Sequence, residues 1–360
     1  MRIIDLHCDT ISEIQAGANI LAGNSSGHVD IPRLREGSVG LQVFAHFISS
    51  VIAKNQAWDK TKEMIELSLQ TFEEFNDYFL KVETAAQVQA NFNSDKIGVM
   101  LAVENGHAIE NSLANLEILR LKGVCYLTLT HSKNLDWAAS SGEKKCKFEG
   151  LTDFGKKVVH AMNEMGMIID VSHVHESTFW DVAQNSKKPF IASHSNAAEL
   201  CPIARNLTDN QIKAIANNGG MIGINFFPGF LDHHYYKQLI STCGDLFNRF
   251  DEIELKYIDD PVERKKGMQE FYIVLNKRME NIHVGFEKIV DHIEYIINMV
   301  GDDFVGFGSD FDGVPTLPGG ISGCDGFKEI LKLLEHRNFT KKTIEKIAFR
   351  NFVRVLNENE

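Results

Sequence analysis

Eight short apolar runs rich in β-branched residues are spread along the 360-residue chain, and they constrain its fold more than any other feature. Most of the runs are continuous rather than alternating, as expected for parallel strands that are buried on both faces. We therefore expect strands at residues 3–7, 41–46, 97–103, 124–130, 167–171, 190–193, 221–226 and 304–308.

Helical patterns lie between these runs. Residues 154–165 place Phe154, Val158, Met162 and Met165 on one face of a helix, and residues 113–121, 177–185 and 289–300 show similar periodicity. Strands that alternate with helices predict a parallel sheet, and eight such units predict a closed (β/α)₈ barrel of the TIM type. A length of 360 residues is ordinary for one such barrel with insertions, so we expect a single domain over 1–360.

Two segments exceed the minimal repeat. Residues 56–82 have the pattern of a long amphipathic helix after the second strand. Residues 232–283 are rich in charge and tyrosine, with a helical pattern that breaks at Pro261. This insertion follows the seventh strand, so we expect it at the active-site end of the barrel. A lid or dimer contact and a plain helical elaboration are both open interpretations of it.

The net charge of −12 argues against a nucleic-acid partner and against attraction to anionic membranes. No apolar run reaches the length of a membrane span, and the N-terminal residues lack the pattern of a secretory signal, so we expect a cytoplasmic protein. The cysteines show no C-x-x-C spacing and are expected to be free thiols; they are Cys8, Cys125, Cys146, Cys201, Cys243 and Cys324.

Ionisable side chains stand where most of the predicted strands end. In a (β/α)₈ barrel these ends converge on one face, so residues far apart in the sequence are expected to share a pocket. The residues are His7, Asp9, Glu104, His131, His173, His194, Asp310 and Asp312.

Five of these residues have the chemistry of zinc ligands: His7, Asp9, Glu104, His173 and His194. His7 and Asp9 point to the same side of a strand because side chains alternate along it. The two oxygens of Glu104 suit a bridge between metals about 3.5–4 Å apart. A single histidine at a strand end is more often structural than metal-binding, but a buried cluster of acids and imidazoles without a cation carries a heavy desolvation cost. The set therefore predicts a two-metal site.

The remaining positions have plainer interpretations. The segment that contains Asp310 and Asp312 also suits a simple turn rich in Asp and Gly. His107 and His175 are left open because each lies close to a candidate ligand. Surface or packing roles are expected for His28, His46, His160, His233, His234, His283, His292 and His336.

Seven segments carry a family resemblance: DLHCDT, ENGHAI, YLTLTHSKN, DVSHVHE, SHSNA, ARN at 204–206 and GFGSDFDGVP. In these segments, which span nearly the whole chain, the sequence resembles the renal or membrane dipeptidase family of zinc peptidases. The mammalian members carry a signal peptide and a lipid-anchor signal, and we expect this protein to have neither. Cys201 falls where those members place a disulfide cysteine, without an obvious partner, and the insertion at 232–283 is longer than theirs.

The resemblance implies a role for each matching residue. His7 and Asp9 would hold one zinc ion, His173 and His194 the other, and Glu104 would bridge them. His131 would contact the substrate and stabilise the oxyanion, and Asp310 would carry the proton. Arg205 would bind the free carboxylate of a dipeptide, which suits the fork of a guanidinium group.

The sequence thus predicts a two-zinc dipeptidase that cleaves L-L or L-D dipeptides with a metal-bridging hydroxide, and a homodimer is plausible by family analogy. A related barrel hydrolase of another amide or an N-acyl amino acid is the first alternative. An inactive metal-binding homologue is disfavoured because no expected ligand is replaced. A sugar- or phosphate-handling barrel would need a glycine loop, for which Gly319 and Gly320 are the nearest candidates.

Overall fold

A ring of parallel strands forms the centre of the computed structural model, which describes residues 1–21, 27–143, 145 and 149–360. The sheet has nine strands, and the pairings β1–β9 and β2–β4 close all of them except β3 into a barrel. The strands of the ring are β1 (Ile3–Cys8), β2 (Val39–Phe47), β4 (Ile97–Glu104), β5 (Val124–Thr128), β6 (Ile168–Asp170), β7 (Ile191–Ala192), β8 (Met221–Ile224) and β9 (Val305–Phe307). Each coincides with a predicted strand, and the predicted (β/α)₈ barrel is confirmed.

The prediction of one long helix over 56–82 is wrong for the residues after 74. Helix α3 covers Lys54–Glu74, and residues 79–81 form the short strand β3 (Phe79–Lys81), which pairs with the start of β4. Asn76 and Asp77 disfavour continuation of the helix because their side chains compete for backbone hydrogen bonds. Phe79 is then buried, with its ring 5.7 Å from that of Phe72 and 6.3 Å from that of Phe44.

Helices surround the barrel, and the predicted helices at 113–121, 154–165, 177–185 and 289–300 are confirmed as α5, α6, α7 and α13. Helix α6 shows why: Thr152 caps its N-terminus, Val158 and Met162 are buried, and Gly166 ends it at a φ of 69°. The helices around the ring are α1 (Thr10–Gln15), α2 (Ile31–Glu36), α4 (Ala85–Asn91), α5 (Leu113–Leu121), α6 (Asp153–Met165), α7 (Glu176–Asn185), α8 (Asp209–Asn217), α13 (Glu287–Val300), α14 (Phe327–His336), α15 (Lys341–Glu345) and α16 (Asn351–Asn359). Short irregular helices are η1 (Gly106–Ile109), η2 (Gly244–Leu246), η3 (Cys324–Gly326) and η4 (Lys346–Arg350).

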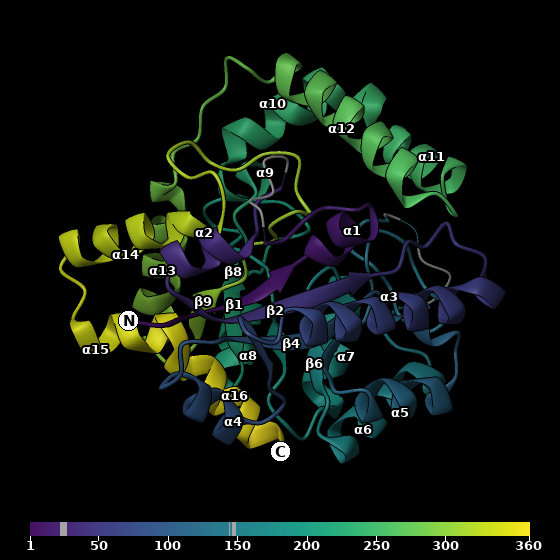
Figure 1. Ribbon diagram of the computed structural model, residues 1–360, viewed down its shortest axis with the longest axis horizontal. Helices are drawn as coiled ribbons and strands as arrows, with labels where there is room; N and C mark the ends of the chain where they lie inside the picture. Colours follow the sequence, from purple (N-terminus) through teal and green to yellow (C-terminus); the bar gives the residue numbers. More distant parts are fainter. Residues whose placement is uncertain (22–26, 144, 146–148) are drawn as a thin grey trace.

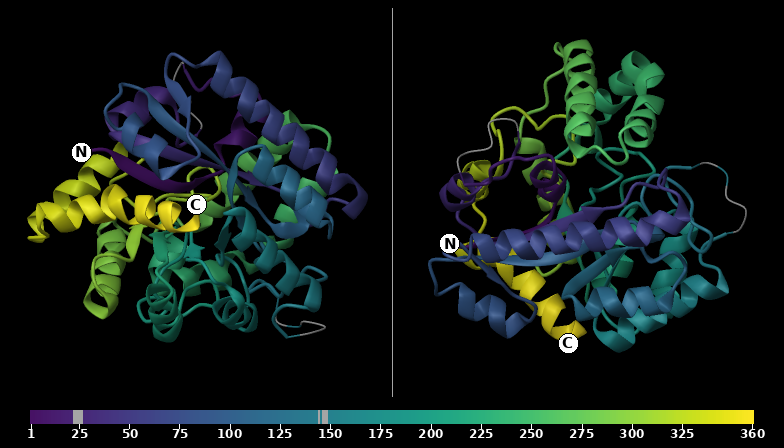
Figure 2. Two further views of the ribbon diagram at one scale, coloured as in Figure 1. Left: turned by 90° about the horizontal axis from the view of Figure 1, so that it is seen from below. Right: turned by 45° about the vertical axis from the view of Figure 1, so that its right-hand side comes forward.

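The two ends of the barrel are covered differently. Helix α16 lies at the end where the C-terminus is (Figure 1, Figure 2), and its Phe352 and Val355 pack in one apolar cluster with Ile4 and Met100 of the strands. The insertion lies at the opposite end (Figure 1) and contains α10 (His233–Cys243), α11 (Asn248–Lys256) and α12 (Pro261–Arg278); the short helix α9 (Pro228–Leu231) precedes it. Pro261 starts α12, so the predicted break and the predicted location are both confirmed.

The insertion helices have an apolar cluster of their own, separate from that of the barrel, to which Tyr235, Leu239, Phe271 and Leu275 belong. The described cysteines are free and buried, as expected; Cys146 lies outside the described residues. Among the described helices, none combines the length and the apolar character needed to cross a membrane.

Candidate metal centre and active-site cavity

The carboxyl ends of the strands bring the predicted ligands together around one carboxylate. Glu104 is the last residue of β4, and its Oε1 lies 3.1 Å from His173 Nε2 and 3.4 Å from His194 Nε2. Its other oxygen, Oε2, lies 3.5 Å from His7 Nε2. Three imidazole nitrogens supplied by three strands thus face the two oxygens of a single buried carboxylate.

Two more groups complete the cluster. Asp9 Oδ2 lies 3.6 Å from His7 Nε2, and one ligand atom from each of His7, Asp9 and Asp310 falls within a 4.8 Å span. One ligand atom from each of Glu104, His131 and His173 likewise lies within 4.8 Å of the other two. Of the residues expected in the pocket from the strand ends, all except Asp312 belong to this cluster, and Asp312 lines the cavity beside it.

The tautomer of His7 is fixed by its neighbours. The Tyr126 hydroxyl donates to the Leu6 carbonyl at 2.8 Å, so it can only accept from His7 Nδ1, which lies 2.8 Å away. In its neutral form the His7 ring therefore carries its proton on Nδ1 and a lone pair on Nε2. That Nε2 atom is buried without a hydrogen-bond partner among the described residues.

His194 is held in the same way through a serine. The Ser193 hydroxyl donates to Asp170 Oδ2 at 2.6 Å and accepts from His194 Nδ1 at 2.7 Å. His194 Nε2 then carries a lone pair, and it lies 2.9 Å from His173 Nε2. Lone pairs that converge on a carboxylate in a buried site are the arrangement in which proteins bind metal ions, so the residues present fit a metal centre.

The charges at the centre also fit a cation. Burial raises the pKa of Asp9 to about 7 and moves the pKa of Asp310 above its usual value. Burial acts in the same direction on Glu104, but His7, His173 and His194 outweigh it and hold the pKa of that carboxyl well below its usual range. Neighbouring carboxylates that burial makes costly to ionise are stabilised by a bound cation.

Asp310 is oriented by a residue that the sequence did not single out. Its backbone has a φ of 65°, its amide donates to the His7 carbonyl at 3.1 Å, and Asn225 Nδ2 donates to its Oδ2 at 2.7 Å. Asn225 directly follows β8, one of the two ring strands, with β2, that contributed no candidate residue. A polar side chain at that position was the signal available in the sequence.

Gly313 shows that the segment around Asp310 is more than a turn. A Cβ atom at this position would collide with Asp9 Oδ2 and with Asp310 Oδ1, which lies 2.6 Å from the ideal Cβ position. The glycine therefore leaves room for two carboxylates of the cluster to approach each other.

Asp312 points away from the cluster. It accepts hydrogen bonds from Thr10 Oγ1 at 2.7 Å and from the His28 amide at 2.5 Å, and its own amide donates to His28 Nδ1 at 2.9 Å. His28, expected at the surface or in packing, is thus a partner of the active-site loop.

The two histidines left open by the sequence serve structure. His107 Nε2 donates to the Ile52 carbonyl at 2.8 Å, and His175 Nδ1 accepts from the Ser177 amide at the start of α7. His46 and His292 are buried and hydrogen-bonded outside the cluster, as a packing role predicts.

Arg205 lies directly behind His194. Its Nη1 donates to Ser195 Oγ and its Nη2 to the His194 carbonyl, both at 2.6 Å, and its guanidinium lies 5.4 Å from the centre of the Phe230 ring. Burial lowers the pKa of Arg205 to about 10, so the group stays charged at neutral pH. Its buried Nε donates to no acceptor among the described residues.

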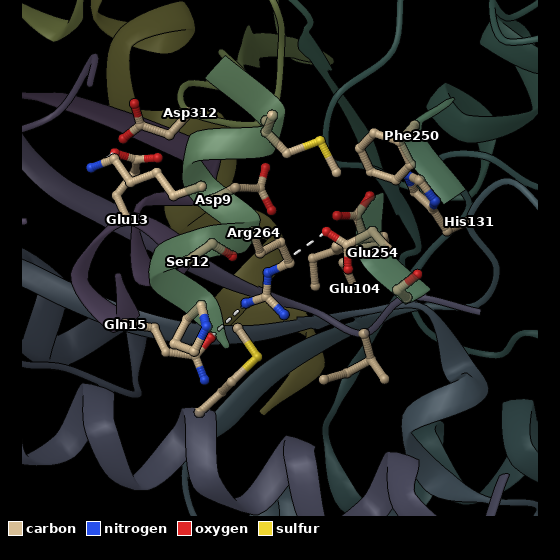
Figure 3. A pocket seen from close by; sticks show the side chains of 18 of the residues that line it. Asp9, Ser12, Glu13, Gln15, Glu104, His131, Phe250, Glu254, Arg264 and Asp312 are labelled. Atoms are coloured by element: carbon tan, nitrogen blue, oxygen red, sulfur yellow. Dashed lines mark hydrogen bonds and ion pairs between the residues drawn. The ribbon is translucent and has the colours of Figure 1, made fainter. Parts of the chain in front are cut away.

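A cavity of about 450 Å³ opens above the cluster. Its floor includes Asp9, Glu104, His131, His173 and Asp310, and the insertion covers it (Figure 3). The roof residues from α11 and α12 are Phe250, Glu254, Pro261, Arg264, Lys265, Met268 and Tyr272. A space of this size encloses a small molecule rather than a polypeptide.

Known proteins of the same kind match nearly the whole chain. The family model described as membrane dipeptidase (peptidase family M19) matches residues 1–360. The dipeptidase tcpJ of Claviceps purpurea is 29% identical over 93% of this chain and 70% of its own length. An uncharacterised dipeptidase of Schizosaccharomyces pombe, C965.12, is 30% identical over 93% of this chain and 73% of its own.

Solved structures agree with these relatives. The metallopeptidase called dipeptidase AC is 25% identical and superposes with a TM-score of 0.82, covering 100% of this chain and 98% of its own. A metallopeptidase of Rhodobacter sphaeroides, 24% identical over 100% of this chain and 99% of its own, shares the fold with a TM-score of 0.81. The match of the family model over the full chain is decisive: the protein belongs to the membrane dipeptidase family, peptidase family M19, and is a metallo-dipeptidase.

Proposed function

We propose that the protein is a two-zinc dipeptidase that hydrolyses the peptide bond of small L-L or L-D dipeptides. The observation that supports it best is Glu104, whose two oxygens face imidazole nitrogens of His7, His173 and His194 at 3.1–3.5 Å. The metallopeptidase of Rhodobacter sphaeroides was solved with a phosphinate mimic of the dipeptide L-Ala-D-Ala, which makes L-D dipeptides the first substrates to try.

In this proposal His7 and Asp9 hold one zinc ion, His173 and His194 hold the second, and Glu104 is shared. Bound zinc supplies Lewis acidity, which makes water nucleophilic near neutral pH and polarises the scissile carbonyl. Tyr126 and Ser193 accept from Nδ1 of His7 and His194, so the Nε2 lone pair of each neutral ring is the one that would face the metal.

The chain itself moves the proton. The Asp310 carboxylate, oriented by Asn225, takes a proton from the attacking water and returns it to the leaving amine. Burial lowers the pKa of His131, so its ring is neutral and donates one N–H toward the carbonyl oxygen as negative charge develops there. The roof from α11 and α12 covers part of the cavity, and the reduced access of bulk water strengthens both interactions.

Arg205→Ala is expected to raise KM by about 10–100-fold with a smaller change in kcat, because a charge-assisted hydrogen bond to the substrate carboxylate is lost in both ground and transition states. The measurement compares a dipeptide with its C-terminal amide in both proteins. The wild type should favour the free acid, and Arg205→Ala should lose this preference. An unchanged preference in the variant would remove Arg205 from carboxylate binding.

A substrate panel separates the proposed dipeptidase from its nearest alternative, a barrel hydrolase of another amide. A panel of dipeptides, tripeptides and N-acyl amino acids is offered to the zinc-loaded protein. Cleavage of dipeptides with tripeptides spared supports the proposal, whereas turnover of N-acyl amino acids alone would favour another amidohydrolase. The phosphate-handling alternative gains no support, because the Gly319 amide already donates to the Val284 carbonyl at 2.7 Å.

Ser193→Ala is expected to weaken zinc binding by about 10–100-fold, because the hydroxyl that orients His194 is lost. Competition with a chromophoric chelator measures this without any turnover. Ser309→Ala is the matched control: Ser309 Oγ lies 2.6 Å from the buried Asp5, as Ser193 Oγ does from Asp170, and its other hydrogen bonds among the described residues are to the backbone of His7 and Phe311 rather than to an imidazole. An equal loss in both variants would mean that Ser193 acts through general stability alone.

A further inference from the structure

The roof of the cavity contains an ion pair that the mechanism does not use. Glu254 lies on α11 and Arg264 on α12, and both line the cavity (Figure 3). Glu254 is only 9% exposed, and its Oε1 lies 3.8 Å from Arg264 Nε. This distance is that of an ion pair and is too long for a hydrogen bond.

Both groups have hydrogen-bonding capacity to spare. Within the described part of the chain Glu254 accepts no hydrogen bond, and Arg264 donates one, from Nη2 to Gln15 Oε1 of α1 at 2.8 Å. A guanidinium has five N–H donors, and buried polar groups are normally satisfied. The vacant positions face the cavity, where a ligand can fill them.

The neighbouring charges are already engaged. Lys265 Nζ lies 2.6 Å from Glu13 Oε2, and Lys60 Nζ lies 2.8 Å from Asp259 Oδ1. The pair of Glu254 and Arg264 therefore sets the polar chemistry of this part of the roof. Apolar surface from Ile258 and Met268 lines the cavity beside it.

One acceptor beside one donor, with charges that nearly cancel, is complementary to a carboxamide. The amide oxygen accepts from the guanidinium of Arg264, and the amide NH₂ donates to the carboxylate of Glu254. An acidic side chain is repelled by Glu254 and a basic one by Arg264. An apolar side chain would bury both groups without new hydrogen bonds, which costs binding free energy.

The position of the pair assigns it to one end of the substrate. Arg205, proposed to bind the C-terminal carboxylate, follows β7. Arg264 is hydrogen-bonded to Gln15 of α1, which follows β1. Strands β9 and β8 lie between β1 and β7 in the ring, so the pair and Arg205 belong to different sides of the cavity. We propose that Glu254 and Arg264 form a subsite for the side chain of the N-terminal residue and select dipeptides that begin with glutamine or asparagine. This subsite rests on the proposed dipeptidase function.

The test measures kcat/KM of the zinc-loaded protein for Gln-Ala, Glu-Ala, Met-Ala, Lys-Ala and Ala-Ala, and for Ala-Gln against Ala-Met. We expect Gln-Ala to exceed Glu-Ala, Met-Ala and Lys-Ala by about tenfold or more. Glu254→Gln should raise kcat/KM for Glu-Ala relative to that for Gln-Ala by about tenfold. Arg264→Gln should raise kcat/KM for Lys-Ala relative to that for Gln-Ala by about tenfold. Arg278→Gln, which removes a guanidinium that pairs with Asp245 near the end of α12, should leave the order unchanged.

Each outcome has a separate meaning. If Ala-Ala is cleaved but the wild type does not favour Gln-Ala, the subsite is wrong and the dipeptidase function stands. If Ala-Gln rather than Gln-Ala is favoured, the assignment to the N-terminal residue is wrong. If no dipeptide is cleaved, the proposed function itself fails. The wild-type series needs no variant, and thermal unfolding with zinc content shows whether each variant is folded.

Discussion

Replacing Asp310 by asparagine is expected to lower kcat by about 10²–10⁴-fold while KM and zinc content change little, because the variant cannot take up a proton. Asparagine has the same shape, and it tolerates the left-handed backbone at this position, where φ is 65°. A large loss of activity in a folded, zinc-loaded variant therefore reports on the proton and not on the fold. The measurement is steady-state kinetics on one dipeptide together with metal analysis.

Asp312 provides the matched control two residues away. It has the same left-handed backbone, with a φ of 64°, but its carboxylate is bonded to Thr10 and to the His28 amide rather than facing the cluster. Asp312→Asn should therefore lower kcat far less than Asp310→Asn. Equal losses in the two variants would contradict a special role for Asp310.

Glu104→Gln is expected to have the second large effect, on metal binding itself. The substitution removes the negative charge that faces three imidazoles, so we expect fewer than two zinc ions per chain and a loss of activity on the order of 10³-fold or more. Zinc content after dialysis and kcat/KM on a dipeptide are the two measurements.

Glu110→Gln is the comparison for this variant. Glu110 stands in the loop after the same strand, and its Oε1 accepts from the Trp58 amide at 2.9 Å, a bond that the amide oxygen of glutamine can keep. It should retain both zinc ions. Full zinc binding by Glu104→Gln would exclude Glu104 as the shared ligand.

The sequence was sufficient for the barrel and for the residues around its mouth. Strands buried on both faces appear as continuous apolar runs, and the carboxyl ends of such strands must meet, so His7, Glu104 and His194 could be grouped before any coordinates were known. The strand β3 was missed because a three-residue strand carries little periodicity and gains its stability from pairing with β4.

The residues that orient the cluster could not be found in this way. Tyr126 lies inside β5 and has the pattern of a core aromatic; only the register of the barrel brings its hydroxyl to His7. Asp170 reaches His194 only through a serine on the neighbouring strand. Glu254 and Arg264 depend on how the insertion helices pack over the barrel, which is a long-range arrangement that local patterns do not encode.

The most direct test of the two-zinc account is a titration. Metal-stripped protein is supplied with increasing zinc, and hydrolysis of L-Ala-D-Ala and of an L-L dipeptide is followed at each point. The account predicts that dipeptide hydrolysis rises to a plateau at two zinc ions per chain, with a tripeptide left uncleaved. A plateau at one zinc ion, or two bound ions without hydrolysis of any dipeptide, would contradict it.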